Sequence, residues 1–304
     1  MDADWANIVL RFVLYADLAL LFGVPLASMW LLRGDAQPAT CRRRLTTFLA
    51  AAGIVFSVVA LLVTARIMMG AESCLAIDAG TLRMIVTETG LGMAWQARML
   101  ALLVCVLASM APCHWRATRI VLPAAAAIAL ATLAWGGHGV MSEGVRGAIH
   151  LPADIVHLLA AGAWVGALAV FVSMSSPKRT ATAGSVAELS RAASGFAHVG
   201  AGIVALLVAT GVANYILIAG PGLSGLLSTR YGGLLLAKLA LFCAMLGLAA
   251  ANRYRLAPRL AYDVHQRDDR AAVLALRRSL RCEAACAMAV LGLVAWLGTL
   301  SPGH

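Results

Sequence analysis

The chain has 304 residues, of which 62% are hydrophobic and only 12% carry an acidic or basic side chain. Soluble globular proteins contain about 25% charged residues, so a soluble enzyme domain, a fibrous protein and a disordered chain are all excluded. The formal net charge of +10 does not indicate nucleic-acid binding, because the basic residues stand in short loops and no aromatic-interleaved basic patch accompanies them.

Eight apolar runs follow one another along the chain, each long enough to cross about 30 Å of hydrocarbon as a helix. We expect them at 6–32, 46–70, 92–111, 119–137, 151–174, 192–219, 231–252 and 279–300. The first run follows an acidic N-terminus and is too long for a signal peptide, so we expect it to be retained. Continuous runs differ from the alternating segments of a membrane β-barrel. The expected fold is therefore an all-α bundle with about eight transmembrane helices.

The loops between these runs alternate in charge. The basic residues of the odd-numbered loops are Arg33, Arg42, Arg43 and Arg44, then Arg116 and Arg119, then Lys178 and Arg179, and finally seven arginines within 253–278. No even-numbered loop has a comparable basic excess. Because basic loops remain on the cytoplasmic side, we expect both termini outside, which in a bacterium is the periplasm.

Two segments between the runs are expected to lie at the surface. The stretch 71–91 is too polar to span, and 81–88 could form a short helix there. The stretch 253–278 mixes Arg and Asp with Ala and Leu, which indicates an amphipathic helix at the membrane face. We divide the chain into an N-terminal four-helix region, 1–137, and a C-terminal one, 138–304. An ATP-driven pump is excluded for this chain alone, since it has no phosphate-binding loop.

The densest group of possible metal ligands lies between the end of the fourth run and the fifth run. Its members are His138, Met141, His150, Asp154 and His157. Asp154 and His157 are three residues apart and share a helix face. Pro152 suits a first helical position, which would leave His150 in the loop above. Imidazole, carboxylate and thioether together suit copper. Two other interpretations stay open. Asp154 could be an acid in the first helical turn, where the helix dipole favours a negative charge, and the histidines could join helices by hydrogen bonds.

The fifth run also carries a packing motif and an aromatic residue. Gly162 and Gly166 form a GxxxG pattern, typical of close helix contact. Trp164 follows His157 by one heptad, so it lies deeper on the same face and could line a path or simply pack. Met68 and Met69 near the end of the second run are either further thioethers or apolar filler.

Ionisable residues elsewhere in the runs are functional candidates because they are costly in hydrocarbon. We expect His198 to lie about 10–15 Å from His157 along the membrane normal, nearer the inner face, where it could be a second binding position on one path. Two axial ligands of one haem must lie at the same depth, so this difference in depth does not suit a haem site.

The lysine in the seventh run, Lys238, needs a partner in the membrane, and Asp17 and Asn214 are the candidates. Arg66 and Arg98 lie near the ends of their runs, so we expect both side chains to extend to the outer interface.

Three stretches together resemble the CopD copper resistance and copper uptake family. Residues 154–166 match its D-x-x-H-x-x-A-x-x-x-W-x-G segment. The second stretch runs from Ser190-Arg191 through Thr210-Gly211, which matches the T-G signature of the family, to Asn214-Tyr215. The third runs from Tyr231-Gly232 to Lys238 and on to Ala251-Asn252-Arg253, and it matches the Y-G-x-x-L-x-x-K and A-x-N-R signatures. The match covers 138 to the end, and the eight-span layout extends it over the chain.

The resemblance implies a copper-handling protein of the bacterial inner membrane that has no enzymatic chemistry. It implies movement of a copper ion from periplasm to cytoplasm, with a separate periplasmic copper-binding protein of the CopC type as partner. The oxidation state of copper and the driving force stay open. Two alternatives stay open as well: a redox protein that binds b-type haem or reacts with quinone, and a copper-binding partner or sensor that transports nothing.

Overall fold

The computed structural model describes residues 5–32, 39–70, 73, 77–111, 116–136, 144–219, 229–266 and 269–300. Eight helices in these ranges are long and apolar enough to cross a membrane. They are Trp5–Leu31, Arg43–Met69, Gly90–Met110, Thr118–Gly136, Ile149–Met174, Ala183–Ile218, Arg230–Gln266 and Arg270–Leu297. The expected all-α architecture and its eight spans are therefore confirmed.

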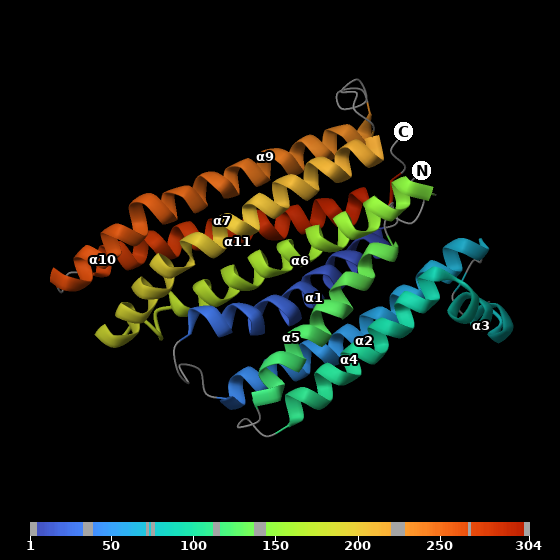
Figure 1. Cartoon of the computed structure of the whole chain (residues 1–304), viewed down its shortest axis with the longest axis horizontal. Coiled ribbons are helices and arrows are strands. Elements are labelled where there is room, and N and C mark those ends of the chain that lie inside the picture. The colour runs from blue at the N-terminus through green and yellow to red at the C-terminus, as the bar shows by residue number, and fades with distance from the viewer. Residues whose placement is uncertain are drawn as a thin grey trace.

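The helices lie side by side along the long axis of the molecule (Figure 1). Their bounds are α1 Trp5–Leu31, α2 Ala39–Met69, α3 Ala79–Glu88, α4 Gly90–Met110, α5 Arg116–Ala131, η2 Thr132–Gly136, α6 Gly144–Met174, α7 Ala183–Ala219, α9 Arg230–Ala251, η4 Asn252–Leu256, α10 Ala257–Gln266 and α11 Arg270–Leu297. Both termini lie at one end of the bundle, which we call the termini end, and α10 lies at the other, the α10 end (Figure 1).

Helix α1 is the centre of the bundle. It packs against α2, α5, α6 and α11, and more than half of its residues are buried. Its closest neighbour is α6, because a Cβ built on Gly166 would overlap the backbone of Gly23. The GxxxG pattern of α6 therefore lets two helix backbones touch. Through α1, the predicted regions 1–137 and 138–304 share an extensive interface.

The short surface helix expected at 81–88 is present as α3, at the termini end beside α2 and α4 (Figure 1). Asp78 caps it: the backbone N–H of Thr81 donates to Asp78 Oδ1 over 3.0 Å, and the Thr81 hydroxyl donates to Oδ2. These bonds from Thr81, the hydroxyl first and the backbone N–H second, lower the pKa of the exposed Asp78 carboxyl. Buried Ile85 packs α3 onto Leu61 and Ala65 of α2.

The expectation that Arg98 extends to the membrane interface is wrong. Its side chain is only 6% exposed. Arg98 Nε donates to Thr132 Oγ1 over 2.8 Å, and its Nη2 donates to the Thr132 carbonyl oxygen over 3.2 Å. At Thr132 helix α5 gives way to the 3₁₀ turn η2, and the guanidinium satisfies backbone and hydroxyl groups at this change of winding. The corresponding expectation for Arg66 stays a prediction.

Several helices extend beyond the predicted runs, among them α2, α7 and α11, which begin at Ala39, Ala183 and Arg270. Two of these differences bear on the site. Helix α6 begins at Gly144, so Pro152 stands inside the helix and His150 is a helical residue that is 1% exposed, and not a loop residue. Helix α9 does not stop at Ala251 but continues through the π-helical turn η4 into α10. The apolar side of α10, with Ala257 and Leu260, is buried, and α10 packs against α7.

Candidate metal site

His157 is held from the neighbouring helix by Thr210. Its Nδ1 lies 2.9 Å from Thr210 Oγ1, and that hydroxyl donates its own hydrogen to the Leu206 carbonyl oxygen over 2.5 Å. A hydroxyl has a single hydrogen, so the tautomer that satisfies both bonds carries the proton of the neutral imidazole on Nδ1 and donates it to Thr210. The second ring nitrogen, Nε2, then keeps a lone pair, which is what a metal ligand needs.

One turn earlier on α6, Asp154 contacts the same helix. Asn214 Nδ2 donates to Asp154 Oδ1 over 3.3 Å. The side chain of Lys238 on α9 is close enough to interact electrostatically with both Asp154 and His157. Three helices thus bring an imidazole, a carboxylate, an amide and an ammonium to one place within the membrane.

A cavity of about 360 Å³ opens beside this group, between α6, α7, α9 and α11. The polar side chains in its wall are His157, Trp164, Tyr215 and Lys238, and the rest of the wall is mostly aliphatic. An apolar cavity with a few convergent polar groups is the usual form of a small-ligand site. We call it the His157 cavity.

The structure separates the remaining predicted ligands from this group. His150 lies two turns before His157 on α6, about 10 Å along the helix, and its Nδ1 has no hydrogen-bond partner among the described residues. His138 and Met141 lie outside the described residues. His198 is exposed on α7 and is absent from the cavity wall, about 18 Å along the helix from Thr210.

In the described parts of the chain, no group of three His, Cys, Asp or Glu side chains is close enough to hold a metal ion. Met68 and Met69 are 60% and 53% exposed at the end of α2, a helix that packs on α1 and α4. A complete set of metal ligands would therefore need groups from outside the described ranges or water molecules bound to the ion.

Of the two candidate partners of Lys238, Asp17 does not pair with it. Asp17 is buried in α1 and faces α2, where a Cβ on Gly53 would lie 2.8 Å from Asp17 Oδ2. The carboxylate that interacts with Lys238 is Asp154, and the other predicted candidate, Asn214, bonds to that same carboxylate. Asp17 is thus a buried acid apart from the His157 cavity.

Sequence reasoning missed two residues. Thr210 stands in a quoted motif, but its partner is 53 residues away, so no spacing rule could pair it with His157. Glu283 is an acid inside the apolar run 279–300, and the rule that singled out Lys238 would have found it. Glu283 is 3% exposed and lines a second cavity, described below.

These features define a polytopic α-helical membrane protein in which a histidine lines a cavity between the spans and a carboxylate lies one turn away on the same helix. Residues 1–148 match the family model "Copper resistance protein D-like, N-terminal domain", and residues 190–297 match "Copper resistance protein D". The chain belongs to the copper resistance protein D family, as expected from its motifs, and it is a multi-pass protein of the inner membrane.

Two relatives match almost end to end. "Copper resistance protein D" of Pseudomonas syringae pv. tomato is 43% identical over 303 residues, covering 98% of this chain and 97% of the relative. "Inner membrane protein YebZ" of Escherichia coli (strain K12) is 32% identical over 303 residues, covering 97% and 98%. No solved structure matches the chain.

Proposed function

We propose that this protein moves copper across the inner membrane, from periplasm to cytoplasm, and that His157 is the indispensable ligand on the way. The observation that carries the proposal is the anchored imidazole. Thr210 fixes Nδ1 as the donor, so Nε2 offers its lone pair without any rearrangement, beside a cavity of about 360 Å³. Membership of a copper resistance family supports copper as the cargo.

The chemistry of the group fits a cation that carries its charge through hydrocarbon. A neutral imidazole binds copper in either oxidation state, and the Asp154 carboxylate offsets the positive charge. Lys238 interacts electrostatically with the same carboxylate. If a Cu(I) ion at His157 and Asp154 displaces the proton of Lys238 into water, the net charge of the site stays the same on loading.

Capture and release would take place at opposite ends of the bundle. His150 precedes the site on α6, on the side of the termini, and we propose that His150, with His138 and Met141 before it in the sequence, receives the ion from a separate periplasmic protein of the CopC type. His198 stands on the opposite side and would meet the ion only after it has left the cavity. Asn214 keeps Asp154 oriented through its amide.

This direction requires periplasmic termini, which the basic odd-numbered loops favour. A reporter enzyme that is active only in the cytoplasm, fused after His304, should be silent, and the same reporter inserted in the loop at 175–182 should be active. Activity of the terminal fusion would reverse the proposed orientation and with it the proposed direction.

The decisive variant is His157→Ala. We expect copper bound per purified protein to fall at least tenfold and copper uptake into cells to drop to the level of cells without the protein. His265→Ala, an exposed histidine on α10, is the matched control and should change neither quantity. Parental uptake by His157→Ala at equal protein level would remove the proposal. A Soret band in the purified parent would instead indicate a haem protein.

A further inference from the structure

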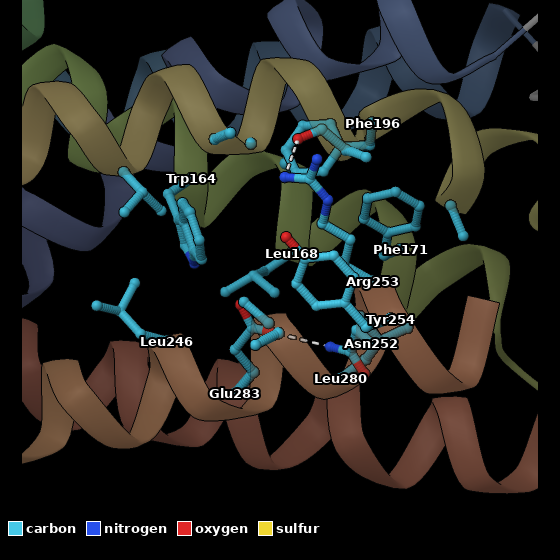
Figure 2. Close-up of a pocket in the computed structure, with 18 of the residues that line it drawn as sticks. Trp164, Leu168, Phe171, Phe196, Leu246, Asn252, Arg253, Tyr254, Leu280 and Glu283 are labelled. Atoms are coloured by element: carbon cyan, nitrogen blue, oxygen red, sulfur yellow. Dashed lines mark hydrogen bonds between the residues drawn. The ribbon is translucent and has the colours of Figure 1, made fainter. Parts of the chain in front are cut away.

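A second cavity of about 370 Å³ lies toward the α10 end, between α6, α7, α9, η4 and α11 (Figure 2). We call it the Glu283 cavity. Trp164 belongs to the walls of both cavities, so its indole stands between them. Tyr254 forms part of the wall near the α10 end and is 69% exposed, so the cavity opens to the outside of the protein at this residue.

The Glu283 carboxyl is buried and oriented by donors. Asn252 Nδ2 donates to Glu283 Oε2 over 2.9 Å. Asn252 begins the π-helical turn η4, and single π-helical turns often mark functional positions because they redirect one side chain. The indole N–H of Trp164 is turned toward Glu283 (Figure 2), and among the described residues it has no hydrogen-bond partner of ordinary geometry.

Two more buried polar atoms near Glu283 have no partner in the described part of the chain. They are Asn252 Oδ1 and, one turn before Glu283 on α11, Ser279 Oγ. Buried polar groups are nearly always hydrogen-bonded to protein or water, so unpartnered atoms around one carboxyl indicate that water or a proton belongs there.

The neighbours of Glu283 are unsuited to a metal ion. The groups of Asn252 and Trp164 that face the carboxyl are N–H donors, and although Asn252 Oδ1 and Ser279 Oγ have lone pairs, the guanidinium of Arg253 lines the same cavity and repels cations. The described contacts of the Arg253 guanidinium are with groups other than Glu283. Its Nη1 donates to the Ala197 carbonyl oxygen over 3.2 Å, and the guanidinium carbon lies 5.1 Å from the centre of the Tyr254 ring.

The ionisable groups of the cavity wall are few. They are Glu283 of α11 with Arg253 and Tyr254 of η4; the wall residues from α6, α7 and α9 are not ionisable. None of the wall residues comes from α1 or α10, the other helices that pack against α11, and His157 and Lys238 lie in the first cavity, beyond Trp164. The one acid of this cavity therefore faces donors, one cation and apolar walls.

We propose that Glu283 is a proton-binding site in the membrane, reached by water from the α10 end through the Glu283 cavity. A proton from this water adds to one carboxylate oxygen and forms an O–H bond; the reverse step returns it to water, and no other bond changes. A second part of the proposal rests on the proposed function, with copper as the transported ion. Trp164 separates Glu283 from His157, and we propose that protonation of Glu283 and binding of copper at His157 influence each other across it, so that copper transport is coupled to the proton.

The test of the site itself does not depend on transport. Infrared spectra of the detergent-solubilised protein, recorded against pH, should show the C=O band of a protonated carboxyl group. This band should disappear in Glu283→Gln and persist in Glu188→Gln, a half-buried acid on α7. A Glu283→Gln spectrum with the same bands as the parent overturns the proposal, whereas a band of the buried Asp17 carboxyl is present in both proteins and cancels in their difference. If that variant does not fold, Glu283→Asp should shift the frequency of the band. A band at the parental frequency in Glu283→Asp also overturns the proposal.

Coupling is measured with the protein in liposomes. Copper flux should vary with the pH at the α10 end in the parent and lose that dependence in Glu283→Gln, while copper binding at His157 stays at the parental level. Flux in the parent that is independent of pH overturns the coupling. Absence of any copper flux in the parent counts against the proposed function alone, because the infrared titration still decides whether Glu283 binds a proton.

Discussion

His157 Nδ1 lies 2.9 Å from Thr210 Oγ1 across the interface of α6 and α7, and the bond of that hydroxyl to Leu206 favours the tautomer whose Nε2 can bind a ligand. Groups that orient a ligating histidine through its second nitrogen are usually worth a factor of about 10–100 in metal affinity. Both the tautomer and the ring orientation of His157 depend on a residue that would bind no metal itself.

The first prediction follows from this bond. Thr210→Val keeps the shape of the side chain and removes the hydroxyl, so the Nδ1 proton of His157 loses its acceptor. Copper affinity, measured by competition with a chelator of known affinity, should fall about 10–100-fold. Thr64→Val on α2 removes a hydroxyl that bonds only within its own helix and should leave the affinity unchanged. Equal affinities in both variants would show that Thr210 does not orient the imidazole.

The second prediction concerns the contact of α1 with α6. In Gly166→Ala the added Cβ would overlap the backbone of Gly23, so the two helices must separate. Overpacking of this kind costs about 1–3 kcal/mol, and we expect a lower unfolding temperature in detergent. Gly247→Ala on α9 is the control, since a Cβ there meets nothing within 4 Å. A Gly166→Ala protein as stable as this control would contradict the contact.

The third prediction tests the buried guanidinium. Arg98→Met has a similar length but leaves the hydroxyl and carbonyl of Thr132 without their donor. An unsatisfied buried acceptor costs about 1–3 kcal/mol, so thermal unfolding of the variant should begin at a clearly lower temperature. Arg83→Met changes an exposed arginine of α3 and should have little effect. The two variants should behave alike if Arg98 instead extends to the lipid headgroups.

The fourth prediction is a pH dependence. Thr81 holds the pKa of Asp78 below its ordinary value, so the cap stabilises α3 above the ordinary pKa of an aspartate, about 3.9. That stabilisation is lost as the pH falls through the lowered pKa. Hydrogen-exchange protection of the α3 amides should therefore drop at low pH in the parent. In Asp78→Asn it should be independent of pH, and an equal drop in this variant would assign the effect to another group.

The spans were predictable because hydrocarbon imposes one simple condition, a long apolar helix, and this condition is local in the sequence. The pairing of Asp154 with His157 on one face was predictable for the same reason. Thr210, Asn214 and Lys238 meet these residues from other helices, across 53, 60 and more residues, and helix packing decides which faces meet.

The errors have the same origin. Arg98 stands near a helix end, where extension to water is the usual outcome, but Thr132 on another helix offers two acceptors that make a buried position favourable. Pro152 favours a helix start, yet α6 begins eight residues earlier, at Gly144. Neighbouring helices can accommodate a proline inside a membrane helix, so the residue alone does not fix the boundary.

The central place of α1 has a consequence for biogenesis. Helix α1 is synthesised first, but its main partner, α6, begins only at Gly144. The contact of Gly23 with α6 forms only when Gly162 and Gly166 are in the membrane. Until α6 has been inserted, Gly23 and the other small residues of α1 that pack against α6 face lipid or a temporary partner. A ribosome-bound fragment ending before α6 should therefore remain accessible to membrane-directed crosslinkers and insertases, and assembly should complete in one late step.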